Sequence, residues 1–446
     1  MKRGLIDIFK LSLIYVISAI TALPLTGCVG DEDIPVIPAE DDRGISVAIA
    51  LSDMGGNNDT RSMPGNDSDD TSGAYGSAAE NYIDINNLYV MTFSIPDGKS
   101  VLCDESQLLE ILWKPRSSGK DESKVAWSGG YAYLQTQLDE NITSYSDGKD
   151  FCIVAIANFS QFGSLTTPPA TGITFKQLQD GAKFNYKPTK TGKWSWSPVD
   201  GKNGIPLFGV KRVNLKGYDK KIHGPQNPYQ LQSNGNPTVW LLRAFAKAEI
   251  RLSDALKNLE LNGTKTEVKI KSASIGNSYS SNFWLIPELS RFSEFNETGG
   301  TGLINAGPTF SEWQSTKANP ADLLSFNVSA DATSATVYLP EYDMTKAENK
   351  PRITVTLEIG GSDQEFSFDF KPYPKDGESS DGQQASWLYI LRNNYYRFIL
   401  DVDFRVITVE PVNWSGAFGN DFNFGDGQTT SPVKPWDDTI KNDYEF

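Results

Sequence analysis

The chain has 446 residues, which is enough for two domains of ordinary size. It carries 56 acidic and 41 basic residues, and the formal net charge of −15 excludes binding to nucleic acid through a broadly basic surface. The single histidine, His223, argues against multi-histidine metal sites and against histidine-based catalysis. We therefore expect no enzymatic activity, no catalytic residue, no metal and no cofactor.

The N-terminal segment has the pattern of a bacterial export signal. Basic residues precede the apolar run "LSLIYVISAITALPL", and "LTGC" (Leu25–Cys28) follows it. This stretch resembles the bacterial lipobox, in which signal peptidase cuts before the cysteine and the thiol is lipidated. We predict a signal peptide over 1–27 and lipidation at Cys28, so that a lipid holds the precursor to the outer membrane. An ordinary signal peptide with an incidental cysteine, or a membrane helix, is the alternative.

A short strand and a polar loop follow. In "ISVAIAL" the alternation places Ile45, Val47, Ile49 and Leu51 on one face of an extended strand. The next residues are rich in Gly, Asn, Asp and Ser, and Arg61 is the only basic residue between Arg43 and Lys99. Exposed polar loops are preferred sites of proteolysis, and Arg61 is the one residue in this stretch that an arginine-specific protease recognises. Arg43 is the competing site, but a cut there would retain the strand.

Period-two patterns dominate the remaining chain. "DFCIVAIANF", "TVWLLRAFAKAEIRLS", "RITVTLEIG" and "YYRFILDVDFRVITVEP" all predict strands, and short helices are expected at 104–112 and 174–181. These patterns predict an all-β protein with sandwich or Greek-key topology. Cys103 and Cys152 would be able to pair in an exported protein, although a buried thiol is an equal reading for Cys152.

The polar region 211–237 is the best place for a domain boundary. We predict a lipidated propeptide with a removable first strand at 28–61 and an N-terminal β-sandwich domain at 62–237. A C-terminal β-sandwich domain follows at 238–415. The tail, 416–446, has low hydrophobicity.

Several segments, in this order along the chain, resemble those of the fimbrillins of Bacteroides-like bacteria. They are "GIPLFGV" (Gly204–Val210), an L-x-R-x-x-A-K pattern at Leu241, Arg243, Ala246 and Lys247, "VYLPEY" (Val337–Tyr342), "LRNNYYRFILDV" (Leu391–Val402) and "VNW" (Val412–Trp414). The resemblance implies two Greek-key or transthyretin-like β-sandwich domains in tandem, with few short helices. It also implies a pilus subunit that is exported as a lipoprotein and polymerised at the cell surface.

In that family an Arg-specific or trypsin-like protease cuts after an arginine that follows the first strand, and the departure of this strand opens a groove. For this chain the resemblance implies a cut between Arg61 and Ser62. A strand of a neighbouring subunit, typically from its C-terminal region, fills the groove. The implied partners are other fimbrial subunits in a homo- or heteropolymer, the protease, and the outer membrane through the lipid. The tail 416–446 is a possible donor segment.

The position of the subunit in the fibre stays open, with a shaft or minor subunit favoured over a tip adhesin. The alternative from a different class is a surface glycan-binding lipoprotein of a polysaccharide-uptake system. In that case Trp194 and Trp196 would stack on sugars, the lipid at Cys28 would be permanent, and Arg61 would not be cut.

Overall fold

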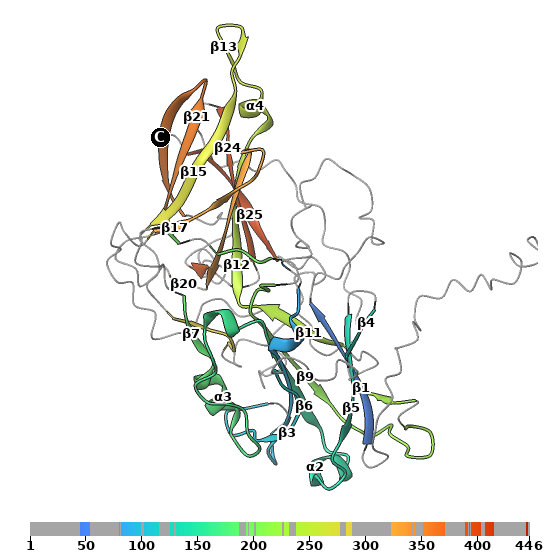
Figure 1. The fold of residues 1–446 in the computed structure, drawn as a ribbon. Helices are drawn as coiled ribbons and strands as arrows, with labels where there is room; N and C mark the ends of the chain where they lie inside the picture. The colour runs from blue at the N-terminus through green and yellow to red at the C-terminus, as the bar shows by residue number, and fades with distance from the viewer. Residues whose placement is uncertain are drawn as a thin grey trace, which may run out of the picture. The chain divides into compact units, whose positions relative to one another are not determined.

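The fold is described from a computed structural model of the chain. It describes residues 45–53, 80, 82–99, 102–115, 125–128, 131–186, 193–194, 196–199, 202–224, 227–231, 238–276, 282–287, 323–340, 342–343, 351–370, 389–390, 392, 394–402, 406–413 and 443–444. These residues all belong to one compact unit, Val36–Phe446. The fold is all-β, as the sequence predicts, with several sheets and short helices (Figure 1).

Within the described residues, no helix has the length and apolar character needed to cross a membrane.

The first half of the chain builds a nine-stranded sheet with the order β3-β2-β6-β9-β11-β1-β5-β4, in which β10 also pairs with β1. Its strands are β1 (Ile45–Asp53), β2 (Leu88–Ser94), β3 (Leu108–Trp113), β4 (Val125–Ser128), β5 (Tyr131–Leu138), β6 (Phe151–Ala157), β9 (Leu207–Val213), β10 (Tyr229–Gln230) and β11 (Thr238–Arg243). β1, the first strand among the described residues, is therefore an interior strand of this sheet.

The sheet folds over on itself around an apolar core. Val47 of β1 and Ile153 of β6 belong to the same buried cluster, although β11 and β9 separate their strands in the sheet order. Along β6 the side chains alternate, so that Phe151 and Ile153 face this cluster while Cys152 and Val154 face another. A β-sandwich therefore forms from one continuous sheet, with β11 linking its two walls.

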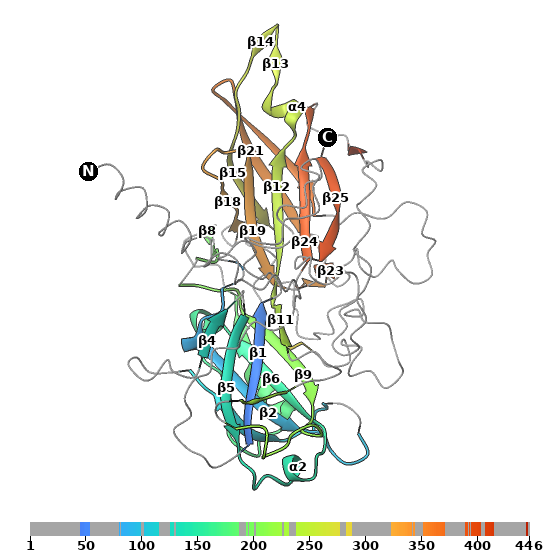
Figure 2. The same ribbon diagram turned by 90° about the vertical axis from the view of Figure 1, so that its right-hand side faces the viewer.

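The second half of the chain, with β8 from the first half, forms a six-stranded and a five-stranded sheet (Figure 2). The six-stranded sheet contains β12 (Phe245–Leu252), β18 (Asn327–Val328), β19 (Ser334–Pro340), β24 (Asn394–Leu400), β25 (Val406–Asn413) and β26 (Asp443–Tyr444); the five-stranded sheet contains β8 (Lys193–Trp194), β15 (Val268–Gly276), β17 (Leu323–Ser325), β21 (Arg352–Ile359) and β22 (Ser362–Asp369). Ile250 of β12 and Ile353 of β21 share one buried cluster, so apolar faces of both sheets contribute to the same core.

Three two-stranded pairs complete the described strands. They are β7 (Lys183–Asn185) with β16 (Asn282–Trp284), β13 (Glu260–Leu261) with β14 (Thr264–Lys265), and β20 (Tyr342–Asp343) with β23 (Tyr389–Ile390).

The long alternating run from Thr238 is two strands rather than one. β11 ends at Arg243 in the nine-stranded sheet, and β12 begins at Phe245 in the six-stranded sheet. The amide of Ala244, between them, donates to the carbonyl of Pro206 at 2.8 Å. The change of sheet thus falls at Ala244, and the domain bounds given above stay a prediction.

One of the two expected helices is present. α3 (Phe175–Gly181) begins with a capping box in which Thr174 and Gln177 each satisfy the other's backbone amide. The helix expected at 104–112 is wrong, because Leu108–Trp113 is β3 and pairs with β2. Pairing with a neighbouring strand outweighs the weak local preference there.

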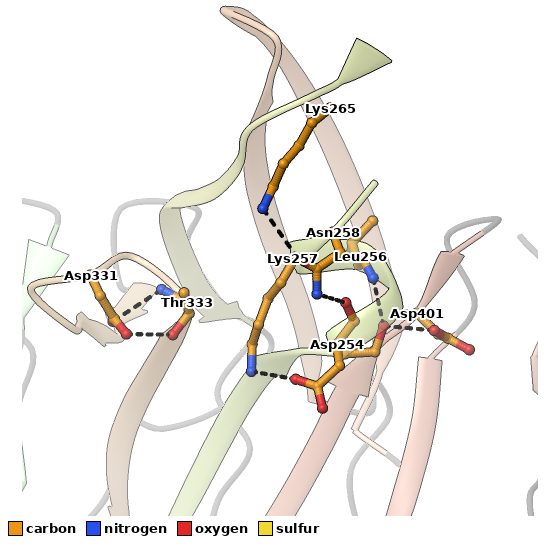
Figure 3. A network of polar contacts seen from close by, with 9 residues as sticks. Asp254, Leu256, Lys257, Asn258, Lys265, Asp331, Thr333 and Asp401 are labelled. Atoms are coloured by element: carbon orange, nitrogen blue, oxygen red, sulfur yellow. Dashed lines mark hydrogen bonds and ion pairs between the residues drawn. The ribbon is translucent and has the colours of Figure 1, made fainter. Parts of the chain in front are cut away.

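The other helical turns are short. They are α2 (Thr143–Ser146), α4 (Asp254–Lys257) and the 3₁₀ turns η1 (Ile85–Asn87) and η2 (Ser160–Phe162). Ser253 caps α4 by accepting from the amide of Leu256, and its hydroxyl donates to Asp401 at 2.6 Å (Figure 3). This pair ties α4 to the end of β24. Cys103 and the buried Cys152 both remain thiols.

Candidate functional site

β1 is held by neighbours on both sides. Its residues Ile45–Ser52 pair antiparallel with β5, while its other edge pairs parallel with β10 and then β11. The amide of Leu231 donates to the carbonyl of Ala48 at 3.1 Å. Figures 1 and 2 both show β1 beside β5. The backbone of β1 therefore satisfies hydrogen-bonding groups of three strands at once.

One face of β1 carries apolar side chains that fill the core of the first sandwich, and we call these side chains the apolar plug. Ile45, Val47 and Ile49 are 7%, 0% and 0% exposed and lie in the core of the first sandwich. Burial of three such side chains contributes roughly 5–9 kcal/mol. The alternation predicted from "ISVAIAL" is correct for these three residues. Leu51 also lies in β1, but its side chain is outside the described part of the chain.

Removal of β1 would open the sandwich wall. Among the described strands, β5 pairs only with β1 and β4, so the β4–β5 pair is attached to the rest of the sheet through β1. Without β1, the edges of β5, β10 and β11 would be unpaired and the core face that Val47 covers would meet water. Such an edge is a template for another strand.

The opposite face of β1 carries small side chains instead of large apolar ones. Ser46 and Ala48 are 3% and 2% exposed, so this face is buried as well. Ala48 lies between Gln135 of β5 and Gln230 of β10, and Ser46 lies opposite Gln137. Directly paired residues share a face of a sheet, with Cβ atoms about 5 Å apart. The small side chains of β1 therefore lie among long amide side chains.

Glu80 is a buried anchor point downstream of the polar segment that follows β1 in the sequence. The side chain of Glu80 is buried, and its Oε1 lies 3.0 Å from Nζ of Lys247 and 2.6 Å from the hydroxyl of Tyr338. Nε of the buried Arg243 also donates to the carbonyl of Glu80 at 3.3 Å. A buried carboxylate needs a partner of opposite charge, and the ion pair with Lys247 and the hydrogen bond from Tyr338 stabilise this one.

The motif residues meet around Glu80. Arg243 and Lys247 come from the L-x-R-x-x-A-K pattern, and Tyr338 comes from "VYLPEY". Nζ of Lys247 also lies 4.8 Å from the ring centre of Tyr395, a residue of the "LRNNYY" segment. Segments that are far apart in sequence thus share one buried cluster, which gives a physical reason for these residue types.

Burial sets the protonation of the tyrosines in this cluster. Burial raises the pKa of Tyr338 well above its ordinary value, and the neighbouring Glu80 carboxylate acts in the same direction. The pKa of Tyr395 is also raised, by burial and then by Glu249, whose carboxylate accepts from its hydroxyl. Both hydroxyls therefore keep their protons and act as hydrogen-bond donors.

Asn158 and Gly204 form a second junction in the first sandwich. The buried Asn158 side chain donates to the carbonyls of Tyr82 and Ile205 and accepts from the amide of Asp84. A Cβ atom at position 204 would lie 2.1 Å from Nδ2 of Asn158. The glycine that opens "GIPLFGV" is thus required by this close approach.

The aromatic residues considered for sugar binding do not form an open platform in the described part of the chain. Trp196 is half-buried and packs against Phe162, Phe245 and Tyr338, and its Nε1 donates to Gln161 at 2.9 Å. The side chain of Trp194 is outside the described residues. This packing weakens the interpretation of Trp196 as a sugar-stacking surface.

The predicted modification sites, Cys28, Arg61 and Ser62, lie outside the described residues, as does the predicted tail 416–446 apart from Asp443–Tyr444. They stay predictions. The sequence alone did not indicate the role of Glu80 or of the glutamine side chains beside β1, such as Gln135. A lone acidic residue at the end of a polar loop carries no local signal, and glutamine in a strand has the pattern of a solvent-facing residue.

No protein-family model and no curated protein matches the chain. Among solved structures, the tip fimbrial protein Mfa3 of Porphyromonas gingivalis, with a C-terminal truncation, is 12% identical over 80% of this chain and 94% of its own, with a TM-score of 0.42. A candidate cell adhesion protein of Parabacteroides distasonis is 15% identical over 91% and 96%, with a TM-score of 0.39. A protein of Bacteroides thetaiotaomicron described as a candidate polysaccharide-binding protein is 12% identical over 82% and 95%, with a TM-score of 0.36.

The chain is similar to fimbrial and cell adhesion proteins of Bacteroides-like bacteria. These proteins are of the kind that the sequence motifs resemble. At these TM-scores the similarity leaves the function to be argued from the residues of the chain itself.

Proposed function

We propose that the protein is a structural subunit of a cell-surface fimbria that supports adhesion and assembles by exchange of its first strand. The observation that carries this proposal is the place of β1. β1, the first described strand, lies in the interior of a sheet, fills an apolar core with Val47 and Ile49, and is followed in the sequence by the polar segment that contains Arg61. A first strand in this position is removable by one cut.

The lipid and the cut have complementary roles in this account. Lipidation at Cys28 delivers the precursor to the outer membrane and tethers it there. A trypsin-like or Arg-specific protease then cuts between Arg61 and Ser62, which severs both the anchor and β1 from the remaining chain. Before the cut, β1 itself occupies its place between β5 on one side and β10 and β11 on the other, which we call the slot. The precursor therefore stays monomeric until it is cut.

After the cut, a strand of another subunit takes the place of β1. Main-chain hydrogen bonds to β5, β10 and β11 supply affinity, and side chains that fill the apolar core supply specificity, as in other cases of strand addition. The Glu80 cluster retains the downstream chain, because its bonds to Lys247 and Tyr338 do not involve β1. A shaft or minor subunit fits this role better than a tip adhesin.

Limited digestion of the purified precursor with trypsin tests the proposal. We expect one early cut after Arg61, loss of the fragment that contains β1, and fibres visible by electron microscopy when a competent partner subunit is present. A precursor that is resistant at Arg61, remains monomeric and binds polysaccharide would instead support the glycan-binding alternative.

Deletion of 416–446 tests the position in the fibre. A shaft subunit that donates its tail should fail to add further subunits beyond itself, whereas a tip subunit without this segment should still be incorporated.

A further inference from the structure

We propose that Lys220 and Lys221 form a second cleavage site, which is protected while a strand fills the slot and opens when β1 leaves. Both lysines lie in residues 214–224, which together with residues 227–231 we call the strap. The strap follows β9 and includes β10. The dependence on the slot rests on the proposed strand exchange and extends it to this second part of the chain. A subunit that is cut but left unfilled is then open to further proteolysis.

β1 holds one end of the strap. Among the described strands, β10 pairs with β1 alone, with Tyr229 opposite Val47 and Gln230 opposite Ala48. The next residue, Leu231, donates its amide to the carbonyl of Ala48 at 3.1 Å. All of these contacts have their partner on β1, so they are lost together when β1 leaves the sheet.

Three rings connect this end of the strap to its middle. The centre of the His223 ring lies 5.0 Å from that of Tyr229 and 5.7 Å from that of Tyr218. Both tyrosines pack against the buried cluster that contains Val47. A Cβ atom at Gly217 would lie 2.8 Å from the hydroxyl of Tyr229, so the first part of the strap passes close to this ring. Tyr229 therefore links the middle of the strap to β1.

Lys220 and Lys221 lie in a tight turn around Asp219. The amide of Lys221 donates to Oδ1 of Asp219 at 2.8 Å, and the amides of Ile222 and His223 donate to the carbonyl of Asp219 at 2.9 and 2.8 Å. Both lysine side chains are exposed. A protease has to draw the chain on either side of the cut into an extended form, and the turn prevents this until it opens locally.

The turn depends on its tertiary contacts. Fixing the backbone of one residue costs about as much free energy as one exposed hydrogen bond returns, so the bonds to Asp219 alone do not keep the turn closed. The ion pair between Nζ of Lys220 and Glu140, at 3.2 Å, is exposed and adds little. The contacts that pass through Tyr229 to β1 therefore decide whether the strap stays closed.

The reaction at the open strap is simple hydrolysis. A protease that cuts after lysine, as trypsin does, adds water across the peptide bond between Lys221 and Ile222. The hydroxyl goes to the carbonyl carbon of Lys221, and the hydrogen goes to the nitrogen of Ile222. No other reactant is needed.

Trypsin digestion of the chain in three states tests the inference. The states are the intact full-length chain, the chain cut after Arg61 from which the severed strand has been removed, and the stripped chain refilled with a fluorescent peptide of Ile45–Asp53. This peptide contains no lysine or arginine and is not itself cut. Mass spectrometry measures the rate of cleavage after Lys220 or Lys221. Lys265, an exposed residue of β14, is the reference site.

Cleavage follows the population of the open strap. We therefore expect the rate after Lys220 or Lys221 to rise about tenfold or more in the stripped chain, and to return close to the intact value with the peptide. The rate after Lys265 should be the same in all three states. Equal cleavage of the strap in the intact and stripped chains would overturn the inference. An equal rise at Lys265 would overturn it as well, because the whole fold would then have opened.

The peptide separates the two hypotheses. If the peptide does not bind to the stripped chain, as followed by its fluorescence anisotropy, strand exchange itself is refuted. If the peptide binds and cleavage of the strap stays fast, strand exchange stands and the conditional site is refuted.

Tyr229→Ala tests the link in the intact chain, where β1 stays in place. We expect cleavage after Lys220 or Lys221 to rise about tenfold, because the strap loses the ring that connects it to β1. Tyr229→Phe is the matched control, since it keeps the ring, and it should be cut at the wild-type rate. A wild-type rate for Tyr229→Ala would show that the strap is not held through this ring and would overturn the inference.

Discussion

Truncation of Ile49 measures how strongly β1 is held. Ile49 is fully buried in the core of the first sandwich, opposite Leu134 of β5. Ile49→Ala removes three carbons, worth about 0.8 kcal/mol each, so the transfer term alone is about 2.4 kcal/mol. The residual cavity adds to this, and we expect the free energy of unfolding to fall by about 2–4 kcal/mol.

The loss of the Ile49 side chain also weakens the binding of β1 to the sandwich once the chain has been cut after Arg61. Since 1.4 kcal/mol corresponds to a factor of ten, a loss of about 3 kcal/mol lowers the retention of the cut strand about 100-fold. Urea unfolding of the intact chain measures the first quantity. Gel filtration and mass spectrometry of the trypsin-cut chain measure the second.

Ile222→Ala is the matched control. Ile222 is 62% exposed, so this substitution removes the same atoms from a side chain at the surface. We expect the control to change stability by no more than about 0.5 kcal/mol. If Ile49→Ala behaves like the control, or if the cut strand is retained equally in both variants, β1 does not hold the sandwich and the reasoning fails.

Three further predictions follow from other residues. Arg61→Ala should leave the precursor full-length at a trypsin dose that converts the wild type and the control Arg43→Ala, and conversion of Arg61→Ala at the wild-type rate would remove Arg61 as the site. Glu80→Ala should lower stability by about 3–5 kcal/mol, because it leaves the buried Lys247 without this carboxylate, whereas the exposed control Glu365→Ala should be nearly neutral in the same thermal melt. Hydrogen bonds from Ser329 and from Thr333, the second shown in Figure 3, lower the pKa of Asp331 to about 2, so its stabilising effect is present above its ordinary pKa of 3.8 and is lost as the pH falls through 2. Asp331→Asn should therefore lower the melting temperature at pH 7 and lower it much less at pH 2, and an equal difference at both values would contradict the assignment.

Period-two alternation predicted the strands well because it reports directly which face of a strand is buried. "ISVAIAL" shows this for Ile45, Val47 and Ile49. The same alternation runs through Thr238–Leu252 without interruption, so the change of sheet at Ala244 left no mark in the pattern. The break follows from the bond between the Ala244 amide and Pro206, which only the tertiary structure provides.

The candidate site was predictable only in part. The apolar plug was visible because its residues lie close together in the chain. The Glu80 cluster was not, because Lys247 and Tyr338 reach Glu80 from strands far along the sequence. The small-residue face of β1 was visible as spacing, but its meaning depends on Gln135 and Gln230 in the neighbouring strands.

The N-terminal residue of the subunit in assembled surface fibres tests the central claim most directly. Edman sequencing or mass spectrometry of fibres sheared from cells should find a start at Ser62, with β1 and the lipidated Cys28 both absent. Fibres whose subunits retain acylated Cys28 and the strand Ile45–Asp53 would contradict the account.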